Sequence, residues 1–216
     1  MQSYEYLSGV YDELMSDVDY DRWAQYLDGI LTQRGARSVF EAACGTGMIT
    51  RRLYEMGYSI IASDKSPAML GTAKQSARKA GCDITFVLQD MRHIEAGNKF
   101  DAVISACDGV NYLDSGGVTE FVTSAYAALK ENGVLLFDIS SKAKLAGMDG
   151  EVYFDDGDDA SCIWKNTYDG AKSALEMDVT LFVRKGELFE RFEETHVQYA
   201  HDADLIVSTA ITAGFK

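Results

Sequence analysis

The chain has few of the features that mark membrane, secreted or metal-binding proteins. Its 216 residues include one proline and four cysteines, and the cysteines form neither a CxxC pair nor a metal-ligand spacing. No apolar run approaches the roughly 20 residues needed to span a bilayer, and the N-terminus lacks a signal-peptide pattern. We therefore expect a cytoplasmic protein with reduced thiols, no membrane association and no metal.

Basic residues are scarce as well. The 20 Lys and Arg residues are outnumbered by 34 Asp and Glu residues, which gives a formal net charge of -14. Because nucleic acids and anionic membrane surfaces are bound by clusters of Lys and Arg, this charge argues against both as partners. The apolar share of 47% and charged share of 25% are those of an ordinary globular protein, and the length suits one α/β domain with an insertion.

The stretch from residue 38 to residue 64 organises the chain. A short apolar run enters a glycine turn, a helix follows, and a second apolar run ends on Asp64. This pattern is typical of the βαβ unit that holds a nucleotide at the carboxyl ends of parallel strands. Gly45 and Gly47 let the backbone approach a ligand closely, and Asp64 lies where an acid can bind both hydroxyls of a ribose.

The residues of this turn favour one nucleoside over another. A dinucleotide site would have a third glycine at the start of the helix, where this chain has Thr50. Glu41 stands at the end of the first strand, and its carboxylate is a poor neighbour for a pyrophosphate but a good one for a sulfonium. The turn therefore favours S-adenosylmethionine over NAD, and an NAD-dependent oxidoreductase stays as an alternative.

Two further strands extend the expected site. Residues 84–88 form a third strand, after which Asp90 can accept a hydrogen bond from an adenine amino group while Met91 packs on the ring. A cap for the next turn is the alternative role of Asp90. Residues 100–105 form a fourth strand, and polar residues just past its tip face the ligand crevice. These residues are Cys107, Asp108, Asn111 and Tyr112.

The first 33 residues are predicted to be helical and are rich in aromatic side chains, namely Tyr4, Tyr11, Tyr20 and Trp23. Ordinary burial of these rings would fasten an N-terminal arm to the sheet. Alternatively, one or two of them close over the cofactor, where a ring can meet a sulfonium by a cation–π contact. The two roles are compatible.

The region from residue 150 to residue 200 reads as an insertion. Its apolar residues alternate at period two, and Asp169-Gly170 and Lys185-Gly186 are turn pairs. The pattern predicts a three-stranded antiparallel meander of residues 163–168, 175–183 and 188–194, which could cover the strand tips as a lid. The expected organisation is an arm and nucleotide-binding core in residues 1–149, the insertion in 150–200, and a helix returning to the core in 201–216.

Four blocks of sequence, in this order and spacing, resemble class I S-adenosylmethionine-dependent methyltransferases: residues 40–47, 63–70, 89–91 and 100–104. Residues 11–23 and 191–196 resemble a bacterial subgroup whose substrates are small or unassigned. The resemblance implies an α/β fold with a doubly wound, mostly parallel Rossmann-like sheet and helices on both faces. It also implies S-adenosyl-L-methionine as cofactor and S-adenosyl-L-homocysteine as product.

The resemblance places Gly45 and Gly47 at the methionine end of the cofactor, Asp64 at the ribose, and Asp90 with Met91 at the adenine. The expected cofactor-binding residues are Tyr11, Tyr20, Trp23, Glu41, Ala43, Cys44, Gly45, Thr46, Gly47, Asp64, Lys65, Met69, Asp90, Met91 and Cys107.

The sequence departs from the family in two places. Glu41 and Ala43 stand where the usual Asp-x-Gly-x-Gly-x-Gly turn has its acid and first glycine; the charge is kept and alanine is small, so we expect binding to survive. The family sheet normally gains two further strands after a helix like residues 202–213, and these are expected to be absent here. A homodimer or the inserted strands could cover the resulting open edge. Without these two strands, a second function stays open, namely that of a module that binds the cofactor but does not catalyse a reaction.

The chemistry follows from the cofactor. A methyl group on a positive sulfur is already activated, so the enzyme mainly has to align a nucleophile, here a small-molecule acceptor, in a dry pocket. His196, with Glu194 and Gln198 on the same face of its strand, is a candidate base. The alternative is a structural histidine on the sheet surface, with its hydrogen bonds satisfied and no catalytic role. Asp108 and Tyr112 are further candidates for groups on the substrate side.

Overall fold

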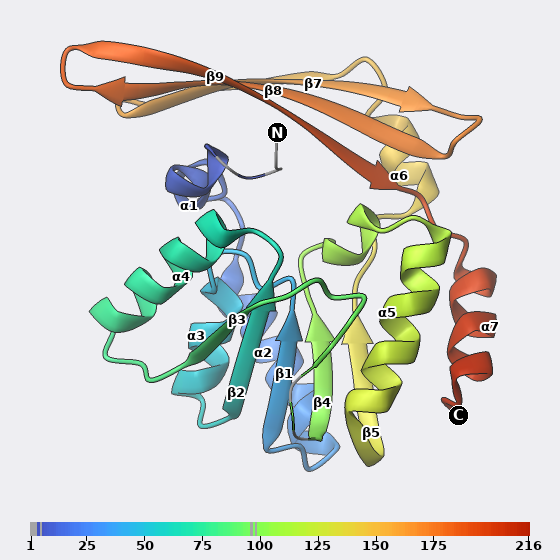
Figure 1. The fold of residues 1–216 in the computed structure, drawn as a ribbon. Helices are drawn as coiled ribbons and strands as arrows, with labels where there is room; N and C mark the ends of the chain where they lie inside the picture. The colour runs from blue at the N-terminus through green and yellow to red at the C-terminus, as the bar shows by residue number, and fades with distance from the viewer. Residues whose placement is uncertain (1–3, 5, 96, 98) are drawn as a thin grey trace.

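The computed structural model describes residues 4, 6–95, 97 and 99–216, and a five-stranded parallel sheet forms its centre (Figure 1). The strands are β1 (Ser38–Ala42), β2 (Ser59–Asp64), β3 (Thr85–Leu88), β4 (Phe100–Ser105) and β5 (Leu129–Phe137). Their order is β3-β2-β1-β4-β5, and each pairing is parallel. The strand order reverses between β1 and β4, so a crevice opens at their carboxyl ends. The predicted doubly wound sheet is confirmed.

Helices cover both faces of this sheet, as expected. The helices α2 (Tyr20–Gln33) and α3 (Met48–Glu55) bury Leu31 and Leu53 against one face, and α5 (Ser115–Ala128) buries Phe121 against the other. Next to α5 lies α7 (Ala203–Ala213), and α4 (Pro67–Lys79) packs against β2 and β3. Two helix starts follow from short sequence signals, an acid before Tyr20 and the pair Ser66-Pro67. Asp19 accepts a hydrogen bond at the start of α2, and Ser66 does so at the start of α4, where Pro67 takes the first position.

The passage from α5 to β5 differs from what its sequence predicts. The apolar residues of 117–130 recur at helical spacing and predict a helix that ends at Lys130, with a strand over 134–139, whereas α5 ends at Ala128 and β5 begins at Leu129. Leu129 already pairs with Phe100, and an irregularity in the ladder around Asn132, which has a φ of +63°, restores the register at Val134. Pairing along β4 overrides the local helical pattern.

A second, antiparallel sheet lies across the carboxyl ends of the parallel strands, with α6 (Lys142–Gly147) on the connection (Figure 1). Its strands are β6 (Val152–Asp156), β7 (Ala160–Asp169), β8 (Ala174–Lys185) and β9 (Leu188–Tyr199), in sequence order. The prediction of three strands is therefore corrected to four. All five residues of β6 are exposed in the structure. A strand with no buried face needs no alternation of apolar and polar residues, so its sequence gave no signal for a strand.

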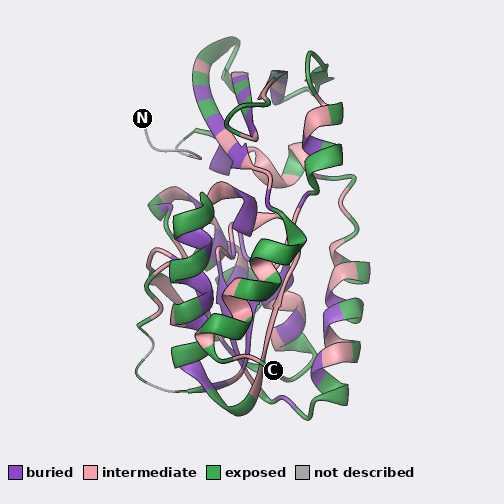
Figure 2. Cartoon of the chain, turned by 90° about the vertical axis from the view of Figure 1, so that its right-hand side faces the viewer, coloured by how far each residue is buried: buried purple, intermediate pink, exposed green. Residues whose placement is uncertain are grey.

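The N-terminal arm fills the space beneath the second sheet. It contains η1 (Leu7–Gly9) and α1 (Tyr11–Leu14). Leu7 is completely buried in a cluster with Cys162, Val179 and Leu181. Figure 2 shows buried and exposed residues alternating along the upper sheet, as expected when one face covers the arm and the other meets solvent.

The edge of the parallel sheet at β5 is open, since in the described part of the chain β5 pairs with β4 alone. Among the helices of that same part, none is long and apolar enough to cross a bilayer.

Candidate active site

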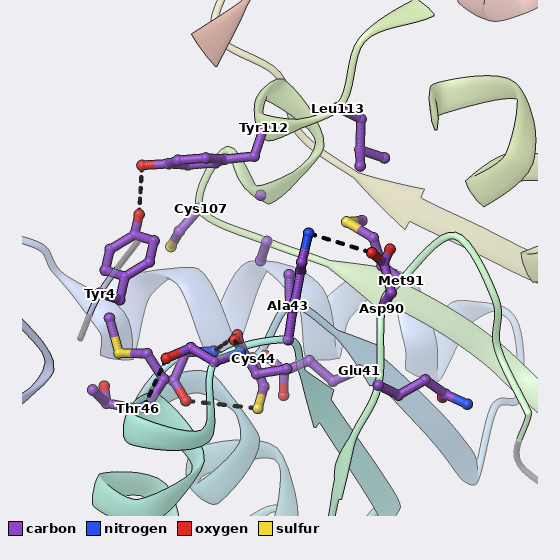
Figure 3. Close-up of a pocket in the computed structure, with 18 of the residues that line it drawn as sticks. Tyr4, Glu41, Ala43, Cys44, Thr46, Asp90, Met91, Cys107, Tyr112 and Leu113 are labelled. Carbon is purple, nitrogen blue, oxygen red and sulfur yellow. Dashed lines mark hydrogen bonds and ion pairs between the residues drawn. The ribbon is translucent and has the colours of Figure 1, made fainter. Parts of the chain in front are cut away.

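A cavity of about 610 Å³ lies where the two sheets and the arm meet (Figure 3). This volume falls within the range of small-molecule sites. Most of the predicted site residues line it, including all of the expected cofactor-binding residues except Gly47 and Trp23. Those that do are Tyr11, Tyr20, Glu41, Ala43, Cys44, Gly45, Thr46, Asp64, Lys65, Met69, Asp90, Met91, Cys107 and, from the substrate side, Tyr112.

The turn after β1 contains three residues in left-handed conformations. The φ angles of Ala43, Gly45 and Gly47 are +54°, +55° and +76°. A Cβ at Gly45 would meet no atom within 4 Å, so the turn leaves open space on the cavity wall. Gly47 does not line the cavity. A Cβ there would lie 3.3 Å from the Cβ of Ala73, so Gly47 allows α3 to start close to α4.

Glu41 is buried at the base of the cavity. The hydroxyl of Thr50 donates a hydrogen bond to its Oε2 at 2.5 Å. Burial raises the pKa of Glu41 to about 8, although the bond from Thr50 opposes this shift. The carboxyl therefore retains its proton near neutral pH until a positive charge is placed beside it. Thr50, which the sequence marked only as a missing glycine, holds this acid in position.

Asp64 is fixed on the cavity wall by backbone groups. Its Oδ2 accepts a hydrogen bond from the amide of Gly45 and its Oδ1 accepts one from the amide of Ser66, each at 2.8 Å. Burial raises the pKa of Asp64, and these hydrogen bonds oppose the shift. Each carboxylate oxygen accepts more than one hydrogen bond, so Asp64 retains capacity for the two hydroxyls of a ribose.

Asp90 is the acceptor of an ion pair at the far end of the cavity. The guanidinium of Arg92 donates to both of its oxygens, at 2.9 and 2.7 Å, and Lys65 lies 3.6 Å away. These hydrogen bonds from Arg92 lower the pKa of Asp90 to about 2. The neighbouring Gln89 also lines the cavity, and its buried Oε1 has no partner in the described residues. A ligand donor at this end would satisfy it.

Two phenols face one another on the opposite side. Figure 3 shows the hydroxyls of Tyr4 and Tyr112 meeting above Cys107, and the Tyr4 hydroxyl donates to that of Tyr112. Burial raises the pKa of both tyrosines, so both stay protonated at neutral pH. Tyr112 is held by η2 (Gly109–Tyr112). The preceding residue, Asn111, was a predicted ligand contact, but it is fully buried and its side chain bonds the backbone of Ser140.

Glu194 fastens the arm behind these phenols. Its carboxylate accepts hydrogen bonds from the amides of Tyr4 at 2.7 Å, Tyr6 at 2.6 Å and Leu7 at 3.0 Å. His196 Nε2 lies 3.1 Å from the same carboxylate. Burial raises the pKa of Glu194, but the hydrogen bonds from His196 and the three arm amides outweigh it, and the net pKa is lowered. Glu194 thus joins the arm to β9.

The structure corrects the prediction for His196. Its side chain is 1% exposed and does not line the cavity, and its ring packs against Tyr4 and Tyr112 with centroids 4.6 and 6.1 Å apart. The histidine therefore lies behind the two phenols, neither on the cavity wall nor on the sheet surface. Its contacts towards the cavity are those with the rings of Tyr4 and Tyr112.

Two other predicted residues also lie outside the cavity. Asp108 has a φ of +54° and donates its amide to Asp138 at 3.0 Å. Trp23 lies a helical turn beyond Tyr20 on α2, and it lines a separate hollow with Tyr26 beside β5. Its expected contact with the cofactor is therefore corrected.

Some lining residues were not predicted. The edge of β9 contributes Thr195, Val197 and Tyr199, and the region before α5 contributes Leu113 and Asp114. No local pattern indicated that these segments would meet above the strand tips. In the described residues, no cluster of His, Cys, Asp and Glu is arranged to hold a metal ion.

Comparison with known proteins agrees with this architecture. Residues 39–133 match the model of a family described as a methyltransferase domain. A Bacillus subtilis (strain 168) protein named as a methyltransferase, YqeM, is 38% identical over 99% of this chain and 86% of its own length. The glycine/sarcosine N-methyltransferase of Halorhodospira halochloris is 30% identical, over 62% of this chain and 53% of its own.

A solved structure is also similar. The S-adenosylmethionine-dependent methyltransferase from Clostridium acetobutylicum ATCC 824 has a TM-score of 0.86 and 28% sequence identity, over 98% of this chain and 87% of that one. This chain belongs to the class I S-adenosylmethionine-dependent methyltransferases.

Proposed function

We propose that this enzyme transfers a methyl group from S-adenosylmethionine to a small-molecule acceptor in the cavity between the strand tips and β9. The observation that carries the proposal is a single cavity with two chemically different ends. One end has the backbone turn and acids that suit an adenosine, and the other has the paired phenols of Tyr4 and Tyr112. The cavity is covered by the arm and by the second sheet.

The residues of the first end fit the cofactor. The open space at Gly45 admits its methionine part, Asp64 has capacity for the ribose hydroxyls, and the unpartnered oxygen of Gln89 lies beside Asp90 and Met91 for the adenine. The buried Glu41 lies where its carboxylate would face the sulfonium. When bound, the cofactor would supply an activated methyl group.

The residues of the other end orient the acceptor. The arm is tied to the glycine turn, because the hydroxyl of Thr46 donates to Asp12 at 2.6 Å, and it is tied to β9 through Glu194. The arm therefore covers the part of the cavity between the glycine turn and β9, where it would shield an acceptor from water. Tyr112, whose phenol stays protonated, would position the acceptor by hydrogen bonding and would not remove its proton.

Calorimetric titration and a transfer assay test the proposal. We expect S-adenosylhomocysteine to bind and NAD not to bind, and we expect S-adenosylmethionine to methylate members of a panel of amines and hydroxy acids. Binding of S-adenosylhomocysteine with no transfer to any panel member would favour an inactive module. Binding of NAD alone would favour an oxidoreductase.

A further inference from the structure

The charges around the cavity are unevenly placed. Asp64, Asp90 and Asp114 line it, Glu41 keeps its proton near neutral pH, and Lys65 and Arg92 are the basic residues among its described lining. Both bases lie at the end opposite the paired phenols and pair with Asp90. A negatively charged acceptor at the phenol end would therefore find no cation among the described lining residues there.

The acidic residues continue behind the wall near Cys107. The amide of Asp108 donates to the carboxylate of Asp138 at 3.0 Å, which brings these two acids together. Burial and the charges of Asp138, Asp108 and Glu41 raise the pKa of the Cys107 thiol to about 12. The one lysine that bonds in this region, Lys144, donates to Ser140 at 2.9 Å and does not line the cavity. Two carboxyl groups thus lie behind this part of the wall, and the positive charge of Lys144 partly offsets them.

The phenol end is lined by uncharged side chains. Tyr4 and Tyr112 offer hydroxyl oxygens and ring faces there, and β9 contributes Val197 and Tyr199 to the wall. Asp114 instead lies on the side of Arg92, because a Cβ at Gly117 would be 3.4 Å from a carbon of Arg92 and from an oxygen of Asp114. Hydroxyl oxygens and aromatic faces bind an amine or its ammonium form. A carboxylate would find no positive partner at the same place among the described lining residues.

Resting on the proposed function, we infer that the acceptor is a small amine that carries no carboxylate. The relative named for glycine and sarcosine matches only 62% of this chain, and both of those compounds carry a carboxylate, which this cavity disfavours. In the transfer, the neutral amine nitrogen uses its lone pair to form the new nitrogen–carbon bond. The carbon–sulfur bond breaks, its electron pair stays on sulfur, and the methylated ammonium then loses a proton to water.

Matched compounds test this inference. Serinol, serine and glycerol share a three-carbon skeleton and differ in whether they carry an amine and a carboxylate. Glucosamine, glucosaminic acid and glucose do the same on a hexose. We expect the amines without a carboxylate to release S-adenosylhomocysteine at least about 10-fold faster than their matched acids and alcohols. Faster turnover of the acids or alcohols, or no turnover of either amine, overturns the inference.

Binding gives a readout that does not depend on turnover. Calorimetry of the complex with S-adenosylhomocysteine should detect serinol or glucosamine and not the corresponding acid. Val197→Lys introduces a cation at the phenol end and should weaken amine binding about 10-fold, whereas Tyr153→Lys, on the exposed β6, should not change it. Unchanged amine binding in Val197→Lys would count against the inference.

The two proposals fail differently. If S-adenosylhomocysteine does not bind, the proposed function fails. If it binds and the methyl group goes to an acid or an alcohol, the proposed function stands and only the inferred amine is wrong.

Discussion

The two ends of the cavity are built in different ways. At the adenosine end, the groups that fix the site are close in sequence: Gly45 and Asp64, which share a hydrogen bond, are 19 residues apart. At the phenol end, Tyr4 bonds Tyr112 across 108 residues and Glu194 across 190. One end is built by consecutive strand–helix units of the parallel sheet, whereas the other exists only after the chain has brought its arm and β9 together.

This difference separates two kinds of specificity. The adenosine end uses backbone amides and a left-handed turn, which follow from the parallel-sheet fold itself. The phenol end uses side chains from an arm and from an inserted sheet, both of which can change without altering the parallel sheet. Changes of acceptor are therefore expected to come from the arm and β9, and the predictions below test that division.

The largest effect is expected at Glu194. Glu194→Ala leaves three arm amides and His196 without their acceptor and should lower stability by about 3 kcal/mol. Chemical denaturation measures the loss, and limited proteolysis should cleave residues 4–14 faster. Glu193→Ala, at the exposed neighbouring position, is the control. Equal protection of the arm in both variants would contradict the role given to Glu194.

The same carboxylate gives a pH dependence. Because the folded-state pKa of Glu194 is lowered from 4.5, its stabilisation is complete above that value and is lost as the pH falls through the folded pKa. Proteolysis of the arm should therefore increase on acidification in the natural protein. Glu194→Ala should lack this part of the pH dependence.

Asp64 is the counterpart at the adenosine end. Asp64→Ala removes the acceptor for Gly45 and the expected ribose contact, and it should weaken S-adenosylhomocysteine binding about 100-fold. Calorimetry measures this, with the exposed Asp83→Ala as control. Arm proteolysis should change less in Asp64→Ala than in Glu194→Ala, since the arm keeps its three hydrogen bonds to Glu194 and only its tie to the glycine turn through Thr46 is affected. An equal loss of arm protection in the two variants would contradict the comparison.

Glu41 should show the opposite sign of pH dependence from Glu194. Its folded pKa is raised from 4.5 to about 8, so its ionisation opposes folding increasingly between these values. Glu41→Gln should therefore be more stable than the natural protein at pH 8, by about 2 kcal/mol, with the gain disappearing near pH 4.5. The variant should also lose its preference for S-adenosylmethionine, whose sulfur is positively charged, over S-adenosylhomocysteine, whose sulfur is neutral. Thermal melts across pH and paired titrations check both effects.

The smallest effect is expected at a helix start. Ser66 accepts a hydrogen bond from the amide of Met69 at 3.2 Å, and Ser66→Ala should lower stability by about 1 kcal/mol. Denaturation measures the change, and Ser66→Thr, which keeps a hydroxyl, should recover part of it. The ranking of acceptors should not change in either variant.

The sequence was informative where structure is local. Gly45, Asp64 and the capping roles of Asp19 and Ser66 follow from short motifs, because turns and helix ends are set by residues a few positions apart. The parallel sheet was predicted for the same reason, since each strand and its following helix form one repeating unit.

The phenol end was harder to predict for a physical reason. His196 was assigned to the cavity from its strand and its alternation, but alternation gives the face of a strand and not what covers that face. The arm covers it, and the contacts that fix the arm join segments far apart in the chain. The fully exposed β6 gave no pattern, and pairing with β4 extended β5 into a stretch with helical spacing.

The attachment of the arm to Glu194 has a consequence for how the protein is made. During synthesis, the five strands of the parallel sheet have all left the ribosome once residue 137 has emerged, and they can begin to assemble. Tyr4, although among the first residues to appear, has no acceptor for its amide until residue 194 follows. The crevice of the nascent chain is therefore not covered by the arm between the emergence of residue 137 and that of residue 194. Covering it is a late event, because the contact of Tyr4 with Glu194 closes a long loop of the chain.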